Sequence, residues 1–289
     1  MPLSQFVLLD YGGGSGFLSL FAKELRIGTV IYADIYDIAC RDAEIIGKAV
    51  GIPADHYVNG DIDDIKKYLH MRSISCDAVA SHDVIEHIYD LEVFFSKLYD
   101  ISDKRFDVVM ATGANSYNPL IKRRLMKKQN KMEYENRFYE KDICERDTRK
   151  SYLDARREII LQYSSGKLAA RDVELLARTT RGKIKKDIIK CVDDYLVRGD
   201  LPVKPEYPTN TCDPYTGNWE EHLIDFKKLK KQIYGLGYTR VDVLPGFYGS
   251  HLKGYIKWPL QRVINALIYL FREKAILVSP FVTVLVRRE

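Results

Sequence analysis

The sequence has few features that would indicate a metal cluster, disulfide bonds or a membrane span. No Cys-x-x-Cys pair is present, which argues against the common zinc, iron–sulfur and thioredoxin-like sites. The longest apolar run, residues 263–271, is about half as long as a bilayer-spanning helix. No charged and then apolar leader opens the sequence, so nothing predicts export. The five cysteines, which we expect to be reduced thiols in a cytoplasmic protein, are Cys40, Cys76, Cys144, Cys191 and Cys212.

Charge is unevenly distributed along the 289 residues. Residues 1–118 hold 10 Lys and Arg against 18 Asp and Glu, whereas residues 119–200 hold 22 against 14. Residues 201–289 hold 13 against 8, and the whole chain has a formal charge of +5. The length allows one elaborated domain, or one domain with a large insertion. The acidic first part and the basic middle predict that these two regions have different functions.

The first 118 residues alternate between short apolar segments and segments with helical spacing. Such alternation predicts an α/β fold with a parallel, doubly wound sheet and right-handed crossovers. Sheets of this kind bind ligands at the carboxyl ends of their strands. The five expected strands lie in residues 5–10, 28–35, 56–62, 76–83 and 105–115.

A glycine-rich turn follows the first expected strand, in the sequence "LLDYGGGSG". A dinucleotide-binding turn would have a further glycine where this chain has Phe17 or Ser19. Asp10 also stands at the strand tip, where its carboxylate would repel a diphosphate and attract a cation. Asp10 could instead cap the following helix.

The spacing Asp10-x-Gly12-x-Gly14-x-Gly16 resembles motif I of the class I S-adenosylmethionine-dependent methyltransferases. The resemblance implies S-adenosylmethionine as cofactor and S-adenosylhomocysteine as product. It also implies a Rossmann-like, seven-stranded, mostly parallel sheet whose last strand is antiparallel and lies between strands five and six.

The same resemblance assigns further cofactor-binding residues at successive strand ends. Asp34, followed by Ile35, would take the ribose hydroxyls, although Asp37 stands close by as an alternative. Asp61, followed by Ile62, would lie near the adenine amine. Asp61 equally fits a helix N-terminal acid that needs no ligand, as Asp63 and Asp64 do.

The stretch "SHDVIEHI" resembles a block of the ubiquinone-biosynthesis O-methyltransferases, and it makes His82, Glu86 and His87 the candidate catalytic residues. His82 could contact the methionine part of the cofactor or accept a proton from an attacking hydroxyl; it could also be a histidine satisfied by local hydrogen bonds. Asp83, Glu86 and His87 resemble part of the magnesium site of small-RNA 2′-O-methyltransferases. That site needs a later histidine, but His222 and His251 lie in no matching motif. We therefore expect no metal.

The region after the fifth strand should select the substrate. Asn115, Tyr117 and Asn118 could hydrogen-bond a polar acceptor, or could simply form a turn before Pro119. Residues 119–205 are predicted as a basic helical insertion that covers the site, after a cofactor-binding part in residues 1–118. The basic excess could receive an anionic substrate or RNA, or could be a solvated face without a partner; nucleic acid is the less favoured partner.

Residues 206–289 are predicted to complete the sheet and to include an amphipathic helix over residues 253–273. Its apolar stripe is bordered by basic residues, so it fits a helix on a membrane surface, but it favours packing on the protein's own sheet. The sequence thus predicts methyl transfer to a polar acceptor, with a hydroxyl oxygen of a small molecule, sugar or lipid-linked intermediate favoured. The alternatives are an RNA 2′-O-methyltransferase and a non-catalytic S-adenosylmethionine-binding module.

Overall fold

The structure is a computed structural model that describes residues 2–102, 105–137, 147–203, 207–249 and 257–289. Its residues divide into two compact units. The first unit contains Met1–Ile85, Asp90–Asn118 and Asp225–Glu289, and the second contains Glu86–Tyr89 and Pro119–Ile224. Cys144, His251 and residues 253–256 of the predicted amphipathic helix lie outside the described residues.

Among the described residues of the first unit, seven strands form one sheet in the order β3-β2-β1-β4-β5-β7-β6. The first five are parallel, and β7 runs antiparallel between β5 and β6. This arrangement confirms the predicted seven-stranded Rossmann-like sheet. The strands are β1 (Val7–Tyr11), β2 (Thr29–Asp34), β3 (His56–Asn59), β4 (Ala78–His82), β5 (Phe106–Thr112), β6 (Arg240–Pro245) and β7 (Val282–Arg288).

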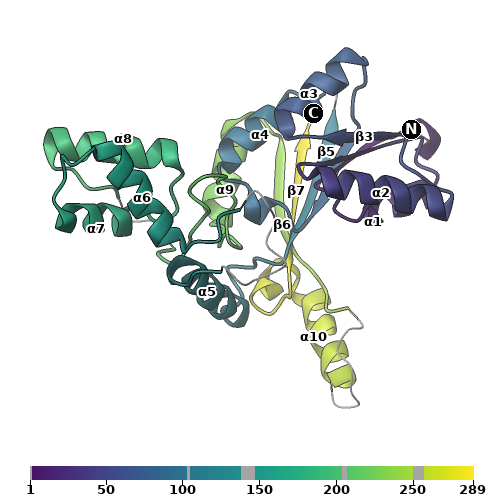
Figure 1. The fold of residues 1–289 in the computed structure, drawn as a ribbon. Helices are drawn as coiled ribbons and strands as arrows, with labels where there is room; N and C mark the ends of the chain where they lie inside the picture. The colour runs from purple at the N-terminus through teal and green to yellow at the C-terminus, as the bar shows by residue number, and fades with distance from the viewer. Residues whose placement is uncertain (1, 103–104, 138–146, 204–206, 250–256) are drawn as a thin grey trace. The chain divides into compact units, whose positions relative to one another are not determined.

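Helices cover both faces of this sheet (Figure 1). The bounds of the helices in this unit are α1 (Phe17–Glu24), α2 (Asp37–Val50), α3 (Ile62–Met71), α4 (Leu91–Tyr99), α9 (Phe226–Gly235) and α10 (Lys257–Phe271). Helices α1 and α2 pack on β1, β2 and β3. On the other side, α3 contacts α4, and α4 contacts α9. Right-handed crossovers place these two groups on opposite faces because the chain first moves outward from β1 and then returns to β4.

The central strands are buried on both faces, as expected of a parallel sheet covered by helices. Val30 to Ala33 of β2 have no exposed surface. On the α1–α2 face, Leu8 and Tyr32 pack with Ala22 and Ala43 in one apolar cluster. Helix α2 ends at Val50 because Gly51 takes a left-handed conformation, with φ of 83°, that favours glycine.

The second unit contains the predicted helical insertion. Its helices are α5 (Pro119–Tyr134), α6 (Tyr152–Ser164), α7 (Ala170–Thr179) and α8 (Lys185–Arg198). Ile160, Leu176 and Val192 come from α6, α7 and α8 and are fully buried in one cluster. The insertion therefore has an apolar core of its own.

Helix α10 differs from the packing that its apolar stripe favoured. Ile268 is buried, but Leu260, Val263, Leu267 and Phe271 are each at least 41% exposed. A short 3-10 helix, η3 (Arg272–Leu277), follows it and leads into β7. Within the described residues, no helix is both long enough and apolar enough to cross a bilayer.

Candidate functional site

The strand order reverses between β1 and β4, at the centre of the sheet. The chain passes from β1 outward to β2 and β3 and then returns to β4. The connections that follow β1 and β4 therefore lead away from each other, toward opposite ends of the sheet. Asp10 of β1 pairs in register with Tyr32 of β2 and with Ala80 of β4. The carboxyl ends of these strands therefore meet at one edge, where open α/β sheets bind their ligands.

The glycine turn after β1 is shaped by positions where a side chain would not fit. Gly12 has φ of 69°, and a Cβ placed on it would lie 2.5 Å from Val84 Cγ2. Gly16 has φ of 77°, and its Cβ would lie 3.0 Å from Ala43 Cβ. Gly14 also has a positive φ, of 51°, but a Cβ there would meet none of the described atoms within 4 Å. Gly14 thus borders open space and needs glycine only for its backbone conformation.

Asp34 at the tip of β2 connects to this turn directly. Its Oδ2 accepts a hydrogen bond from the Gly14 amide at 3.0 Å, and its Oδ1 accepts one from the Tyr36 amide at 2.9 Å. Asp37, the alternative acid, is exposed on α2 and forms an ion pair with Arg41. The geometry therefore favours Asp34 over Asp37 as the acid beside the glycine turn.

Asp10 is 1% exposed, and the Ser19 hydroxyl donates a hydrogen bond to its Oδ2 at 2.6 Å. Burial raises the pKa of Asp10 to about 6, because water no longer solvates the carboxylate. Ser19 lies in the first turn of α1, so Asp10 does bind the start of that helix. This capping contact and a role in attracting a cation are compatible.

Asp61 caps α3. Its Oδ1 accepts hydrogen bonds from the amides of Asp63 and Asp64, and the Asp64 side chain accepts one from the Asp61 amide. This capping box gives Asp61 a structural role, while its binding to a ligand stays a prediction. Ile62 is buried, whereas Ile35 is exposed at the end of β2.

His82 ends β4, and its side chain is exposed at the same edge. Its Nδ1 lies 3.1 Å from Asp83 Oδ2. A carboxylate attracts an N–H group, so this contact favours the tautomer with the hydrogen on Nδ1, in which Nε2 is the acceptor. Asp83 is held in a left-handed conformation with φ of 54°, and its Oδ1 accepts a hydrogen bond from the Gly113 amide at 2.9 Å.

The predicted substrate residues after β5 are mostly buried. The Asn115 Nδ2 donates to the Ile276 carbonyl at 2.8 Å and to the Ser279 carbonyl at 2.9 Å. The Asn118 Nδ2 also donates to Ser279, and the Tyr117 ring stacks on Phe226. These contacts fasten the loop after β5 to the segment before β7. Substrate binding by the three residues stays a prediction.

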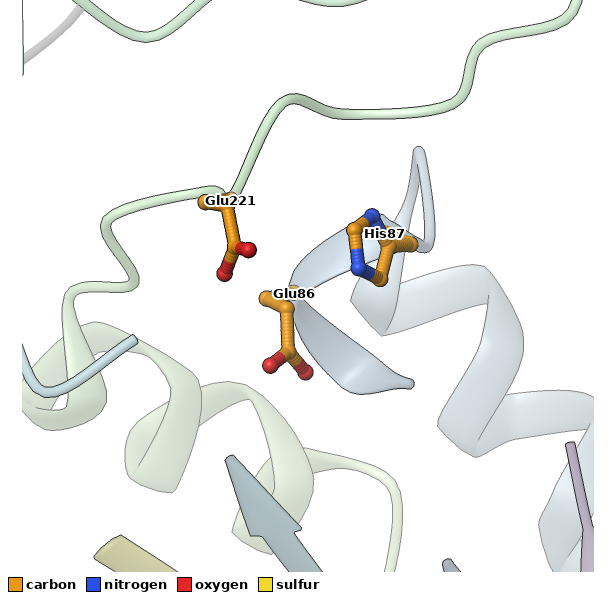
Figure 2. Close-up of side chains that lie close together, drawn as sticks. All are labelled: Glu86, His87 and Glu221. Atoms are coloured by element: carbon orange, nitrogen blue, oxygen red, sulfur yellow. The ribbon is translucent and has the colours of Figure 1, made fainter. Parts of the chain in front are cut away.

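Glu86 and His87, the other two candidate catalytic residues, belong to the second unit. They lie in the 3-10 helix η2 (Ile85–His87), and Figure 2 shows the Glu221 side chain beside them. One ligand atom from each of the three residues lies within 4.8 Å of the others. His87 Nδ1 is 2.9 Å from the Trp219 carbonyl, and the His222 amide donates to the Glu86 carbonyl at 3.0 Å. This set could hold a divalent cation, because carboxylates and a backbone-oriented histidine are common metal ligands.

A lysine already supplies a positive charge to this cluster. Lys128 Nζ lies 3.2 Å from Glu221 Oε1 and 2.7 Å from Glu220 Oε1. His222, the later histidine considered for a metal, stacks on Trp219, and burial lowers its pKa to about 4. It is therefore neutral near pH 7. The structure brings Glu221 to the Glu86–His87 pair, and it places His222 in a stacking contact with Trp219.

Sequence reasoning missed three contacts at these sites. Asp83 Oδ2 lies beside His82 Nδ1, the Tyr32 hydroxyl donates to the Gly14 carbonyl at 2.6 Å, and Glu221 joins a pair that precedes it by more than 130 residues. The position of Asp83 directly after His82 was a usable signal. Nothing in the sequence pointed to Glu221.

The family described as "Methyltransferase domain" matches residues 9–104, which contain the glycine turn, Asp34, Asp61 and His82. The chain contains a class I S-adenosylmethionine-dependent methyltransferase domain. The site residues fit this cofactor, since a Cβ on Gly14 would meet none of the described atoms within 4 Å and the carboxylates of Asp10 in β1 and Asp34 in β2 would attract a cation. No curated relative matches the chain.

Several solved structures resemble this methyltransferase distantly. An S-adenosylmethionine-dependent methyltransferase from Mesorhizobium loti is 14% identical, with a TM-score of 0.45, over 100% of this chain and 94% of that one. The CurJ carbon methyltransferase is 13% identical, with a TM-score of 0.43, over 99% of this chain and 50% of that one. A putative sarcosine dimethylglycine methyltransferase from Galdieria sulphuraria is 19% identical, with a TM-score of 0.32, over 38% of this chain and 40% of that one. These likenesses are too distant to indicate an acceptor.

Proposed function

We propose that this methyltransferase transfers the methyl group to a hydroxyl oxygen, with His82 as the general base. The acceptor would be a small molecule, a sugar or a lipid-linked intermediate. The observation that carries the proposal is the 3.1 Å contact between His82 Nδ1 and Asp83 Oδ2, on an exposed side chain at the ligand-binding edge. A histidine beside a carboxylate is useful as a base when the nucleophile must lose a proton.

The cofactor supplies an electrophilic methyl group on a positively charged sulfur. Asp34 and the amides of the glycine turn would hold its ribose, while Ile35 and Asp61 would lie near its adenine. Asp10 would attract its positive charge. With the methyl donor bound, His82 Nε2 would take the proton of the acceptor hydroxyl as its oxygen received the methyl group. The protein mainly positions the two reactants.

The sequence "DVIEHI", residues 83–88, supports a hydroxyl acceptor, since it resembles a block of the ubiquinone-biosynthesis O-methyltransferases. Asp83 would act there as a positioning residue for His82. Asn115 and Asn118 would act on substrate choice indirectly, by holding the loop after β5 against Ile276 and Ser279. Tyr117, beside them, would be the member of this group that contacts the acceptor.

An RNA 2′-O-methyltransferase is the second candidate, and two observations favour it. The insertion has a basic excess, and Glu86, His87 and Glu221 converge as metal ligands could. The ion pairs of Lys128 with Glu220 and Glu221 weigh against it, because a bound metal would have to displace a charge that is already paired. We therefore rank it below a small hydroxyl acceptor.

The test is to measure S-adenosylhomocysteine formation with three acceptor panels: phenols, sugars and single-stranded RNA. We expect turnover with a phenol or sugar, and a rate that falls about 100-fold in His82→Asn while cofactor affinity is kept. Turnover confined to RNA would establish the second candidate. Cofactor binding without turnover on any panel would make the domain a non-catalytic binding module.

A further inference from the structure

Helix α10 turns its apolar face toward solvent and its polar face toward the protein. The Asn265 Oδ1 accepts a hydrogen bond from the Tyr248 amide at 2.9 Å, and the side-chain amides of Gln261 and Asn265 both donate to the Tyr248 carbonyl. Ile268, on the same side, is 1% exposed. The polar residues that usually face water are thus used to attach the helix.

The opposite side of α10 is a continuous apolar surface. At 3.6 residues per turn, this surface covers an arc of roughly 140° around the helix axis. In order around the arc, its residues are Ala266, Leu270, Val263, Leu267, Leu260 and Phe271. All are exposed, and Leu270 is 70% exposed. Among residues 259–271, this arc contains no charged side chain. A soluble helix normally shows the reverse arrangement, so this surface is suited to a partner that removes it from water.

Basic residues border this apolar surface. Residues 257–274 hold four Lys and Arg against one Asp or Glu, a net charge of +3. Arg262 lies on the helix next to the apolar arc, and Arg272 and Lys274 follow its end; all three are exposed. An apolar face with a basic border is typical of helices that lie in the interface of an anionic membrane.

The helix leaves the sheet at the edge that carries the active site. His82 pairs with Ala111 of β5, and the next residue of β5, Thr112, pairs with Val282 of β7. Val282 also pairs with Pro245, the last residue of β6, so the segment between β6 and β7 starts and ends at this edge. Figure 1 shows α10 extending beyond the ends of β6 and β7.

We propose that α10 docks this methyltransferase on the surface of an anionic membrane, with Val263, Leu267 and Leu270 inserted among the lipids. A second copy of the chain is the competing occupant. Pairing two copies through this face would bring two basic surfaces together, whereas anionic headgroups would neutralise them. Charge complementarity therefore favours lipid. Docking would place the edge with His82 near the bilayer, which suits a lipid-linked acceptor. The docking itself does not require the acceptor to be a lipid.

The test is co-sedimentation of the full chain with vesicles of phosphatidylcholine alone or of phosphatidylcholine mixed with phosphatidylglycerol. We expect binding to the mixed vesicles that weakens as salt rises. The double variant Leu267→Glu/Leu270→Glu should bind at least about tenfold more weakly, because it puts charge into the apolar surface. Ile45→Glu, at another exposed apolar residue of the same unit, is the matched control and should bind like the unaltered chain.

Circular dichroism and S-adenosylmethionine affinity should be unchanged in these variants, since all three side chains are exposed. Absence of binding to mixed vesicles would overturn the proposal. A dimer in sedimentation equilibrium that the double variant abolishes would also overturn it, in favour of a second copy. Methyl transfer is measured separately, so failure of vesicle binding and failure of the proposed reaction give different results.

Discussion

The Asp34 carboxylate accepts a hydrogen bond from the Gly14 amide, with a nitrogen–oxygen distance of 3.0 Å. This bond joins the tip of β2 to the turn after β1. The Tyr32 hydroxyl adds a second connection by donating to the Gly14 carbonyl. Both polar groups of the Gly14 backbone are thus oriented by β2, which holds the turn in place for the cofactor.

Asp34→Ala should weaken S-adenosylmethionine binding by about 1–3 kcal/mol, or roughly 5- to 150-fold, because a charged acceptor beside the turn is lost. Asp37→Ala is the matched control: its carboxylate is exposed and pairs with Arg41, so affinity should change little. Isothermal titration calorimetry with S-adenosylmethionine and S-adenosylhomocysteine measures both. Equal losses in the two variants would contradict the assignment of Asp34.

Gly12→Ala and Gly14→Ala should behave differently although both glycines have a positive φ. A Cβ on Gly12 would overlap Val84, whereas one on Gly14 would meet open space among the described residues. We expect Gly12→Ala to lower the free energy of unfolding by about 2–4 kcal/mol and Gly14→Ala by about 1 kcal/mol. Urea unfolding without ligand measures this difference. A Gly14→Ala chain that folds but no longer binds S-adenosylmethionine would show that the open space beside Gly14 is ligand space.

Much of the fold followed from local patterns in the sequence. Apolar segments such as residues 5–10 and 28–35 were recognisable as buried strands, and their alternation with helices allows few topologies. The expectation that β7 lies between β5 and β6 came from the family resemblance and is confirmed. Asp10 was recognisable as a carboxylate at a strand tip, whereas Asp34 was assigned by the same resemblance.

The rest depended on tertiary contacts that no local pattern records. Glu221 reaches Glu86 and His87 through the backbone pairing of residues 86–87 with Trp219 and His222, which spans more than 130 residues. The orientation of α10 is another case. Its apolar stripe predicted a helix, but Gln261 and Asn265 bind the Tyr248 backbone and turn the stripe outward. A helical period alone does not say which side faces the protein.

Asp83→Asn should lower the methyl-transfer rate without removing the base. The amide would still accept from Gly113 but would orient the His82 ring less strongly, so kcat should fall about 10- to 100-fold. Circular dichroism and S-adenosylmethionine affinity separate this effect from a structural one, because both should stay unchanged if Asp83 acts only by orienting the ring. A rate equal to that of the unaltered chain would contradict the positioning role.

Chelation with EDTA should leave the methyl-transfer rate unchanged within about twofold, because Lys128 already neutralises Glu221. Mn²⁺ should likewise leave the melting temperature of the unaltered chain unchanged. Lys128→Ala removes the competing charge, so in that variant Mn²⁺ should raise the melting temperature. Loss of activity on chelation, restored by Mg²⁺ or Mn²⁺, would instead establish a metal at Glu86, His87 and Glu221.

Asp10→Asn should stabilise the ligand-free fold while weakening cofactor binding. The pKa of Asp10 is raised from 3.8 to about 6, so the folded chain binds the proton more tightly than the unfolded chain. The stability of the unaltered chain therefore falls as pH rises from about 4 to 6, and at pH 7 the neutral amide should gain about 3 kcal/mol. Cofactor binding has the opposite dependence, because a positive charge favours the ionised carboxylate. S-adenosylmethionine affinity should thus drop about fivefold from pH 6 to pH 5 in the unaltered chain and stay flat in Asp10→Asn. Urea unfolding and calorimetric titration across this pH range test both halves, and a flat affinity profile in the unaltered chain would show that Asp10 does not interact with the cofactor's charge.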